Sequence, residues 1–196
     1  ANGSVVINED NTVTYTPNAD FNGVDSFIYT ASDGVDTSDA TVTITINPVN
    51  DAPVAVGANV ITDEDVSIAI TLNGTDVDGD VLSYTLLTSP VNGTLSGIAP
   101  DLTYTPFTNF NGLDSFTFLV NDGTVDSAVA TVNITVNPAN DAPVADSQIV
   151  TTNEDMAVAI ILTGSDIDGD ALTFTPGMPA NGVLSGVAPY LDYTPN

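Results

Sequence analysis

The 196-residue sequence contains 26 acidic side chains and no lysine, arginine, histidine or cysteine, so its formal net charge is −26. This composition excludes a basic surface for nucleic acid, imidazole or Schiff-base chemistry, disulfide bonds and thiolate metal sites. Because its side chains cannot form ion pairs with one another, we expect the surface to need an external cation. No apolar run is long enough to span a membrane, whereas 42% hydrophobic residues can fill one or two packed cores.

A repeat of about 90 residues organises the chain. The hexapeptide Asn-Asp-Ala-Pro-Val-Ala occurs at 50–55 and again at 140–145, each time between two runs of β-branched residues. Proline restricts the alanine before it to extended conformations, so both copies are predicted to be joints between domains. We therefore predict the C-terminal half of a repeat (1–50), one complete repeat (51–140) and the N-terminal half of another (141–196). Because both ends cut through a repeat, we expect this sequence to be part of a longer tandem-repeat protein.

Short runs of alternating apolar and polar residues fill the complete repeat. Ile68, Ile70 and Leu72, for example, alternate with smaller or polar residues, and Asn-Gly, Asp-Gly and proline turns separate successive runs. The predicted strands are, in chain order, 54–62, 66–72, 81–88, 93–96, 102–105, 114–120 and 128–136. Seven strands without helical periodicity are typical of an immunoglobulin-like β-sandwich. Without cysteine and tryptophan, its core must consist of valine, isoleucine, leucine, phenylalanine and tyrosine.

The order of the motifs resembles the cadherin-like and bacterial immunoglobulin-like tandem repeats of large secreted bacterial proteins, including repeats-in-toxin-type adhesins. The matching motifs are Asp-Ala-Pro-Val-Ala at the joint, Thr-Asp-Glu-Asp at 62–65, Asp-Val-Asp-Gly-Asp at 76–80, Asn-Gly-Thr at 92–94, Leu-Thr-Tyr-Thr-Pro at 102–106, Phe-Asn-Gly-Leu-Asp-Ser-Phe at 110–116 and Asn-Asp-Gly at 121–123. The resemblance covers the whole chain. It implies an all-β array of tandem seven-stranded immunoglobulin/cadherin-like sandwiches.

The same resemblance implies a non-enzymatic spacer or stalk in an extracellular or cell-surface protein of bacterial type. Its partners would be the neighbouring repeats of the same chain, with no nucleic acid and no insertion into a membrane.

Calcium at the joints is a further implication of the resemblance. In cadherins a linker of the type Asp-x-Asn-Asp-Asn, an early glutamate and an Asp-x-Asp motif hold the ion. Here Asn47 replaces the first acid and Ala52 the last asparagine, and no Leu-Asp-Arg-Glu motif is present. We therefore expect a weaker joint, with a single ion. The residues that resemble ligands are Asn50, Asp51, Glu64, Asp65, Asp76, Asp78 and Asp80, and in the next repeat Asn140, Asp141, Glu154, Asp155, Asp166, Asp168 and Asp170.

Electrostatics independently favour a cation at the loop 76–80. Each pair of neighbouring aspartates there costs about 1–4 kcal/mol of repulsion unless the charges are neutralised. Calcium takes six to eight oxygen ligands, whereas magnesium prefers to keep its water. The loop is not an EF-hand, since Val81 and Leu87 stand where glycine and glutamate would be needed. The alternative is that the loop merely turns the chain between two strands.

Other repeated motifs favour a structural role. Asp-Gly at 33–34 and 122–123 is typical of hairpin turns. Phe-Asn-Gly at 21–23 and 110–112 is interpreted as a hydrophobic plug before a turn. Paired carboxylates could serve a glycosidase, but every acidic motif recurs with the repeat, which favours architecture over catalysis.

Two other functions remain open. The chain could be the subunit of an extracellular filament or surface layer, in which half-repeats of neighbouring copies complete each other. The same strand pair is duplicated at 1–18 and 180–196, however, which makes clean complementation awkward. A carbohydrate- or ice-binding module would use Thr-rich faces such as Thr41, Thr43 and Thr45, which reflect ordinary β-propensity.

Overall fold

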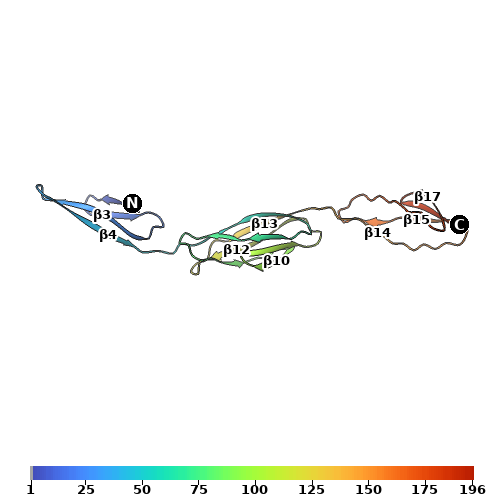
Figure 1. Cartoon of the computed structure of the whole chain (residues 1–196), viewed down its shortest axis with the longest axis horizontal. Coiled ribbons are helices and arrows are strands. Elements are labelled where there is room, and N and C mark those ends of the chain that lie inside the picture. Colours follow the sequence, from blue (N-terminus) through green and yellow to red (C-terminus); the bar gives the residue numbers. More distant parts are fainter. Residues whose placement is uncertain (1) are drawn as a thin grey trace.

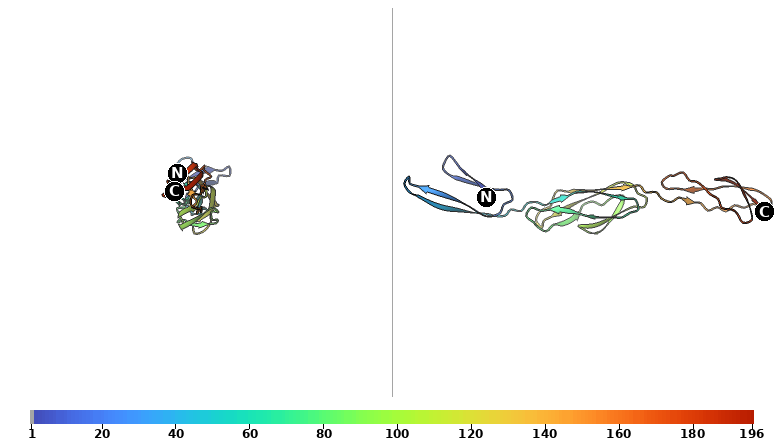
Figure 2. Two further views of the ribbon diagram at one scale, coloured as in Figure 1. Left: turned by 90° about the vertical axis from the view of Figure 1, so that its right-hand side faces the viewer. Right: turned by 45° about the horizontal axis from the view of Figure 1, so that its top comes forward.

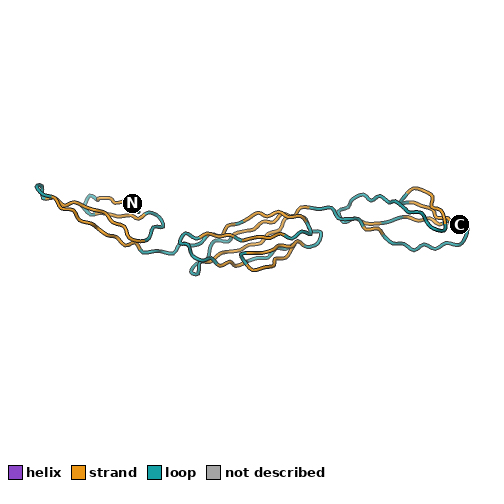
Figure 3. Tube along the Cα trace, in the orientation of Figure 1, coloured by secondary structure: helices purple, strands orange, loops and turns teal. Residues whose placement is uncertain are grey.

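The computed structural model describes residues 2–196 as an extended rod of three groups of strands (Figure 1). Within these residues there are 18 strands and no helix (Figure 3), hence no helix that could cross a membrane. We refer to β1–β4 as the first module, to β5–β13 as the middle module and to β14–β18 as the third module. Strand-free linkers join them, and the end-on view shows that the modules lie nearly on one axis (Figure 2).

The middle module contains all seven predicted strands. The first is divided in two, and a short strand that the sequence does not predict, β8, follows the second, so nine strands result: β5 (Val54–Val56), β6 (Ala58–Asp63), β7 (Ile68–Thr71), β8 (Asn73–Thr75), β9 (Ser83–Leu86), β10 (Gly93–Ile98), β11 (Asp101–Pro106), β12 (Gly112–Asn121) and β13 (Ala130–Asn137). The first strand is divided because the chain changes sheet: β5 pairs with β8, while β6 pairs in parallel with β13. The predicted all-β sandwich is thus confirmed.

Two sheets enclose the core of the middle module. One has the strand order β6-β13-β12-β9 and the other the order β10-β11-β7. The alternating residues of the long strands point inward, and the largest fully buried side chains are Tyr104, Phe116, Phe118, Val120, Val132, Ile134 and Val136. Gly93 is required beside Tyr104, since a Cβ at this position would lie 2.5 Å from the tyrosine ring. Apart from Ala130, the buried core therefore consists of the five residue types that the sequence predicts.

The outer modules repeat parts of this arrangement. The first contains β1 (Gly3–Ile7), β2 (Val13–Pro17), β3 (Gly23–Ser32) and β4 (Thr37–Ile46), which correspond in sequence to β10–β13. The third contains β14 (Val144–Ala145), β15 (Val158–Ile161), β16 (Gly164–Ser165), β17 (Gly182–Val187) and β18 (Tyr190–Pro195). Its sheet β15-β18-β17 has the order of β7-β11-β10 in the middle module.

Candidate cation sites at the joints

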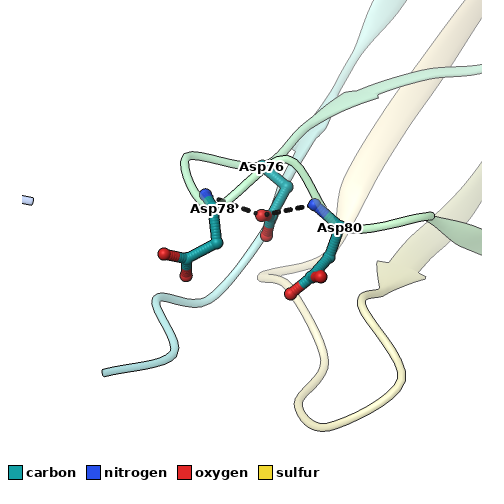
Figure 4. Close-up of side chains that lie close together, drawn as sticks. All are labelled: Asp76, Asp78 and Asp80. Atoms are coloured by element: carbon teal, nitrogen blue, oxygen red, sulfur yellow. Dashed lines mark hydrogen bonds between the residues drawn. The ribbon is translucent and has the colours of Figure 1, made fainter. Parts of the chain in front are cut away.

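The loop 76–80 gathers three carboxylates (Figure 4) next to the linker from the first module. Asp76 lies at its centre, and its Oδ1 accepts the backbone N–H groups of Asp78 at 2.9 Å and Asp80 at 3.1 Å. Gly79 allows this tight turn because it adopts a φ of 81°. One carboxylate oxygen from each aspartate lies within 4.8 Å of the others. The second oxygen of Asp76, Oδ2, is buried and has no hydrogen-bond partner.

Asp78 also receives the linker from the first module. Its Oδ2 accepts the backbone N–H of Asp51 at 2.8 Å, which brings the linker acid beside the loop. A cavity of about 270 Å³ opens at this first joint, and its lining includes Asp20 from the first module. Acids from both modules and from the linker therefore meet around one small cavity.

Asn50 fixes the other side of the linker. Its Nδ2 donates to Oδ2 of Asp122 at 2.8 Å and to the carbonyl of Asp51 at 3.1 Å. This hydrogen bond, together with those from the backbone of the turn, lowers the pKa of Asp122. The hairpin turn predicted at 122–123 is present, with Gly123 at a φ of 97°. The turn also anchors the linker to the middle module.

The second joint lies at the opposite end of the middle module, where this module meets the linker to the third module. Glu64, only 3% exposed, accepts the backbone N–H of Ala139 at 2.6 Å and the side-chain amide of Asn111 at 3.3 Å. The neighbouring Asp65 has a φ of 59° and accepts the backbone N–H of Asn109 at 3.1 Å. The Asn109 side-chain amide lies 3.2 Å from oxygens of both Asp65 and Asp141 and donates to both when its nitrogen faces them.

Asp141 stands where the acids of the second joint meet. Burial raises the pKa of its carboxyl group, and negative charges from both adjoining modules raise it further. The acids responsible are Asp168, Asp65, Glu64 and Asp166. Its backbone N–H donates to Oδ2 of Asp168 at 2.7 Å, which repeats the linker contact of the first joint. Because its pKa is raised, the carboxyl group of Asp141 resists ionisation as long as no cation neutralises the surrounding acids.

Most of the predicted ligands lie at the two joints. Asn140 donates to the Asp141 carbonyl, and Asp170 donates its N–H to Asp166, as in the first joint. Glu154 and Asp155 instead lie in the turn before β15, away from both joints.

Sequence reasoning missed four polar residues at the joints, namely Asp20, Asn109, Asn111 and Asp122. Asp20 and Asn109 occupy equivalent positions and share a left-handed backbone, with φ values of 58° and 57°. The available signal was their place beside the repeated Phe-Asn-Gly motif. Phe110 does pack against the core, as predicted, but the asparagines on either side of it face the joint.

One set of acids is structural and lies away from the joints. Asp114, 8% exposed, accepts the hydroxyl of Tyr104 at 2.9 Å and three backbone N–H groups. Asp25 receives the hydroxyl of Tyr15 at 2.7 Å in the same way. Because protein donors already satisfy these carboxylates, they are poor candidates for a cation, unlike Asp76.

Family comparisons cover almost the whole chain. Residues 50–135 and 140–196 match the family described as a bacterial Ig domain, and residues 1–48 match a bacterial cadherin-like domain. Both families consist of non-catalytic repeat modules of the kind found in extracellular multidomain proteins.

Two curated relatives come from Dictyostelium discoideum. Integrin beta-like protein A is 34% identical over 143 residues, which is 62% of this chain and 7% of the relative. Integrin beta-like protein B is 40% identical over 67 residues, or 33% of this chain and 3% of the relative. The chain thus spans less than a tenth of the length of either protein.

Solved cadherin structures share the fold. The crystal structure of human CDH23 EC21-23 aligns with 97% of this chain over 71% of its own length, with a TM-score of 0.56 and 14% identity. The extracellular cadherin domains 1–5 of protocadherin gamma B2 align with 99% of this chain over 44% of their length, with a TM-score of 0.52 and 16% identity. At such identities the likeness shows the arrangement of the strands alone.

Proposed function

The chain belongs to the bacterial Ig domain family, and on this premise we propose that it is a spacer segment of an extracellular, adhesin-type bacterial surface protein. Its modules keep functional parts of the parent protein apart, and calcium at the joints stiffens the rod. The neighbouring modules of the same chain are its partners in this role.

The observation that carries this proposal is the convergence of acids at the joints. Each joint combines carboxylates from two modules and the linker, in a chain that has no basic side chain to neutralise them. The buried, unpartnered Oδ2 of Asp76 is the feature that an oxygen-binding cation would satisfy. Asp114, by contrast, already has four donors of its own.

Calcium fits the chemistry of these groups. The donors are carboxylate, amide and carbonyl oxygens, which are hard ligands that calcium takes six to eight at a time. At the first joint the ligands would come from Asp76, Asp78, Asp80 and the linker. At the second joint, Glu64 and Asp65 would join the linker and the loop 166–170. An ion bound by both modules opposes bending, because bending the rod would separate its ligands.

Calcium should also stabilise the fold by mass action. Extracellular sites often have dissociation constants of about 0.1–1 mM, so 10 mM calcium would contribute roughly 1.4–2.7 kcal/mol. For a module of this size, that is a rise of roughly 6–20 °C in the melting temperature. Magnesium at the same concentration should have a smaller effect, because it retains its water shell.

Calcium titrations followed by calorimetry and thermal unfolding test the proposal. Asp76→Asn should abolish binding at the first joint and reduce the thermal shift of the middle module, while binding at the second joint remains. Asp39→Asn is a matched control, since Asp39 is exposed on β4 and its carboxylate accepts the hydroxyl of the nearby Thr30. Equal calcium responses in wild type, Asp76→Asn and Asp39→Asn would refute a site in this loop.

A further inference from the structure

The two linkers of the middle module attach to strands that lie side by side and run in the same direction. The linker from the first module enters β5, which continues into β6 after the single residue Gly57, and the linker to the third module leaves from β13. Strands β6 and β13 are parallel and share six paired positions. The linkers lie at opposite ends of the module (Figure 1). A pull along the rod therefore draws β6 and β13 in opposite directions along their common axis.

Sliding is the movement that a strand pair resists most strongly. Evenly spaced hydrogen bonds join parallel strands, so sliding one strand along the other strains the whole ladder together. Peeling the strands apart from one end would break the same bonds one after another. The inner side of the pair is dry, since Val132 and Ile134 on β13 are fully buried. On the outer side, the side-chain amide of Asn133 donates to Oδ1 of Asn59 at 3.0 Å.

Further bonds reinforce the pair at the end from which the third module pulls. The backbone N–H of Glu64 donates to the carbonyl of Asn137 at 2.9 Å, one residue beyond the last pair. The side-chain amide of Asn137 donates to Oδ1 of Asp63 at 3.1 Å. The carboxylate of Glu64 accepts the N–H of Ala139 at 2.6 Å, which ties the linker itself to the end of β6. Each of these bonds joins β6, or the residue after it, to β13 or its linker.

We propose that β6 and β13 form a mechanical clamp, which holds tension along the rod and must rupture before the middle module unfolds under force. The spacer role proposed above supplies only the source of the tension, because the clamp lies within one module and needs no cation. The other sheet, β10-β11-β7, attaches to neither linker. Its strands stay unloaded until the clamp fails.

Two glycines allow the same disturbance to be placed inside and outside the clamp. Gly57 precedes β6, and the carbonyl of Thr131 lies 2.7 Å from where a Cβ would be. A methyl group there would push the start of β6 away from β13. Gly93 is equally tight, because its Cβ would lie 2.5 Å from the ring of Tyr104, but it belongs to β10.

Single-molecule force spectroscopy of the 196-residue chain in two pulling directions tests the proposal. Because the chain has no cysteine, pairs of introduced cysteines attach the handles at defined positions. Val49→Cys with Ala142→Cys pulls along the rod, through both linkers. Val49→Cys with Val129→Cys pulls at the adjacent starts of β6 and β13, because Val129 is the exposed residue before β13.

Both pulls should lengthen the chain by about 3.3–3.6 Å for each residue between the handles. The rupture force along the rod should be at least about twice the force that separates the adjacent strand ends, because sliding strains the ladder together and peeling does not. Equal rupture forces in the two directions would overturn the proposal.

The glycine variants, pulled along the rod, test the clamp against the general stability of the module. Forced unfolding follows the unfolding rate, which a substitution raises only when the contacts that it weakens break by the transition state. Gly57→Ala should raise this rate roughly five-fold or more, whereas Gly93→Ala should change it by less than about two-fold despite its cost at equilibrium. A larger effect of Gly93→Ala, or equal effects, would contradict the clamp.

These measurements are made in chelator, so that calcium at the joints plays no part in them. If Gly57→Ala prevents folding, the two pulling directions in the otherwise wild-type chain still decide the question. Equal rupture forces would leave calcium stiffening of the rod intact, and a rod without a calcium response would leave the clamp intact. The two proposals therefore fail separately.

Discussion

Replacing Asp114 by asparagine should destabilise the middle module without disturbing its shape. The carboxylate Oδ1 accepts the N–H groups of Val91 and Ser115, and Oδ2 accepts the N–H of Asn92 and the hydroxyl of Tyr104, all at 2.8–2.9 Å. An amide offers one accepting oxygen, so one pair of donors would face an NH₂ group. The tyrosine hydroxyl can rotate to accept, but the backbone N–H of Asn92 cannot.

The magnitude follows from these contacts. A buried donor without a partner costs about 1–3 kcal/mol, and the remaining bonds lose the strength that the charge gives them. We expect a loss of roughly 2–3 kcal/mol, which lowers the melting temperature of the module by roughly 8–24 °C. Denaturant unfolding followed by tyrosine fluorescence measures this loss of stability. The control Asp126→Asn removes an exposed acid of the same module that accepts from Asn121, and should change stability by less than about 0.5 kcal/mol.

The pH dependence of the free energy of unfolding provides a second test of the role of Asp114. Burial tends to raise the pKa of Asp114, but the four donors outweigh it and hold the pKa below its ordinary value of 3.8. A carboxyl group with a lowered folded pKa stabilises the fold above its unfolded pKa, and this stabilisation is lost as the pH falls through the folded pKa. The difference between wild type and Asp114→Asn should therefore shrink below about pH 4. A variant as stable as its control at pH 7 would refute the reasoning.

Three further predictions concern the joints and the packing. Because the pKa of Asp141 is raised, its ionisation should weaken the joint as the pH rises from 3.8 towards the folded pKa, and calcium should lower this pKa in a carboxyl NMR titration. Asn50→Ala removes the first cause of the lowered pKa of Asp122, which should move towards its ordinary value in the same titration, and an unchanged pKa would contradict the linker contact. Gly93→Ala should destabilise the middle module by about 1–3 kcal/mol in denaturant unfolding, because its Cβ would overlap the ring of Tyr104. In the comparison variant Gly123→Ala, the Cβ would meet no atom within 4 Å, so that variant measures the cost of a positive φ alone.

The sequence predicts the sandwich well because alternation specifies which face of a strand is buried. Phe116 and Phe118 lie two residues apart and are both fully buried, as alternation requires. The break at Gly57, where the chain passes from β5 to β6, carries no periodic signal. It depends on the close approach of the Thr131 carbonyl, 2.7 Å from where a Cβ would be.

The joints are predicted only in part because they combine residues that are distant in the sequence. The repeated acidic loops identify Asp76 and Asp166, and local spacing is sufficient for that. Asn109 approaches Asp141 only because the β11–β12 loop and the linker reach the same end of the module. Asp114 has the same residue type as the joint acids, and its burial beside Tyr104 becomes visible only in three dimensions.

The stiffness of the rod is the central claim, and small-angle X-ray scattering with and without calcium measures it most directly. The wild-type chain at low concentration is the suitable sample, because dilution keeps contacts between molecules out of the scattering curve. With millimolar calcium, we predict the distance distribution of a straight rod with a larger maximum dimension. With chelator, the distribution should shorten and broaden as the joints bend, and Asp76→Asn in calcium should lie between the two samples, because only its first joint loses the ion. Scattering curves that superimpose with calcium and with chelator would contradict the account.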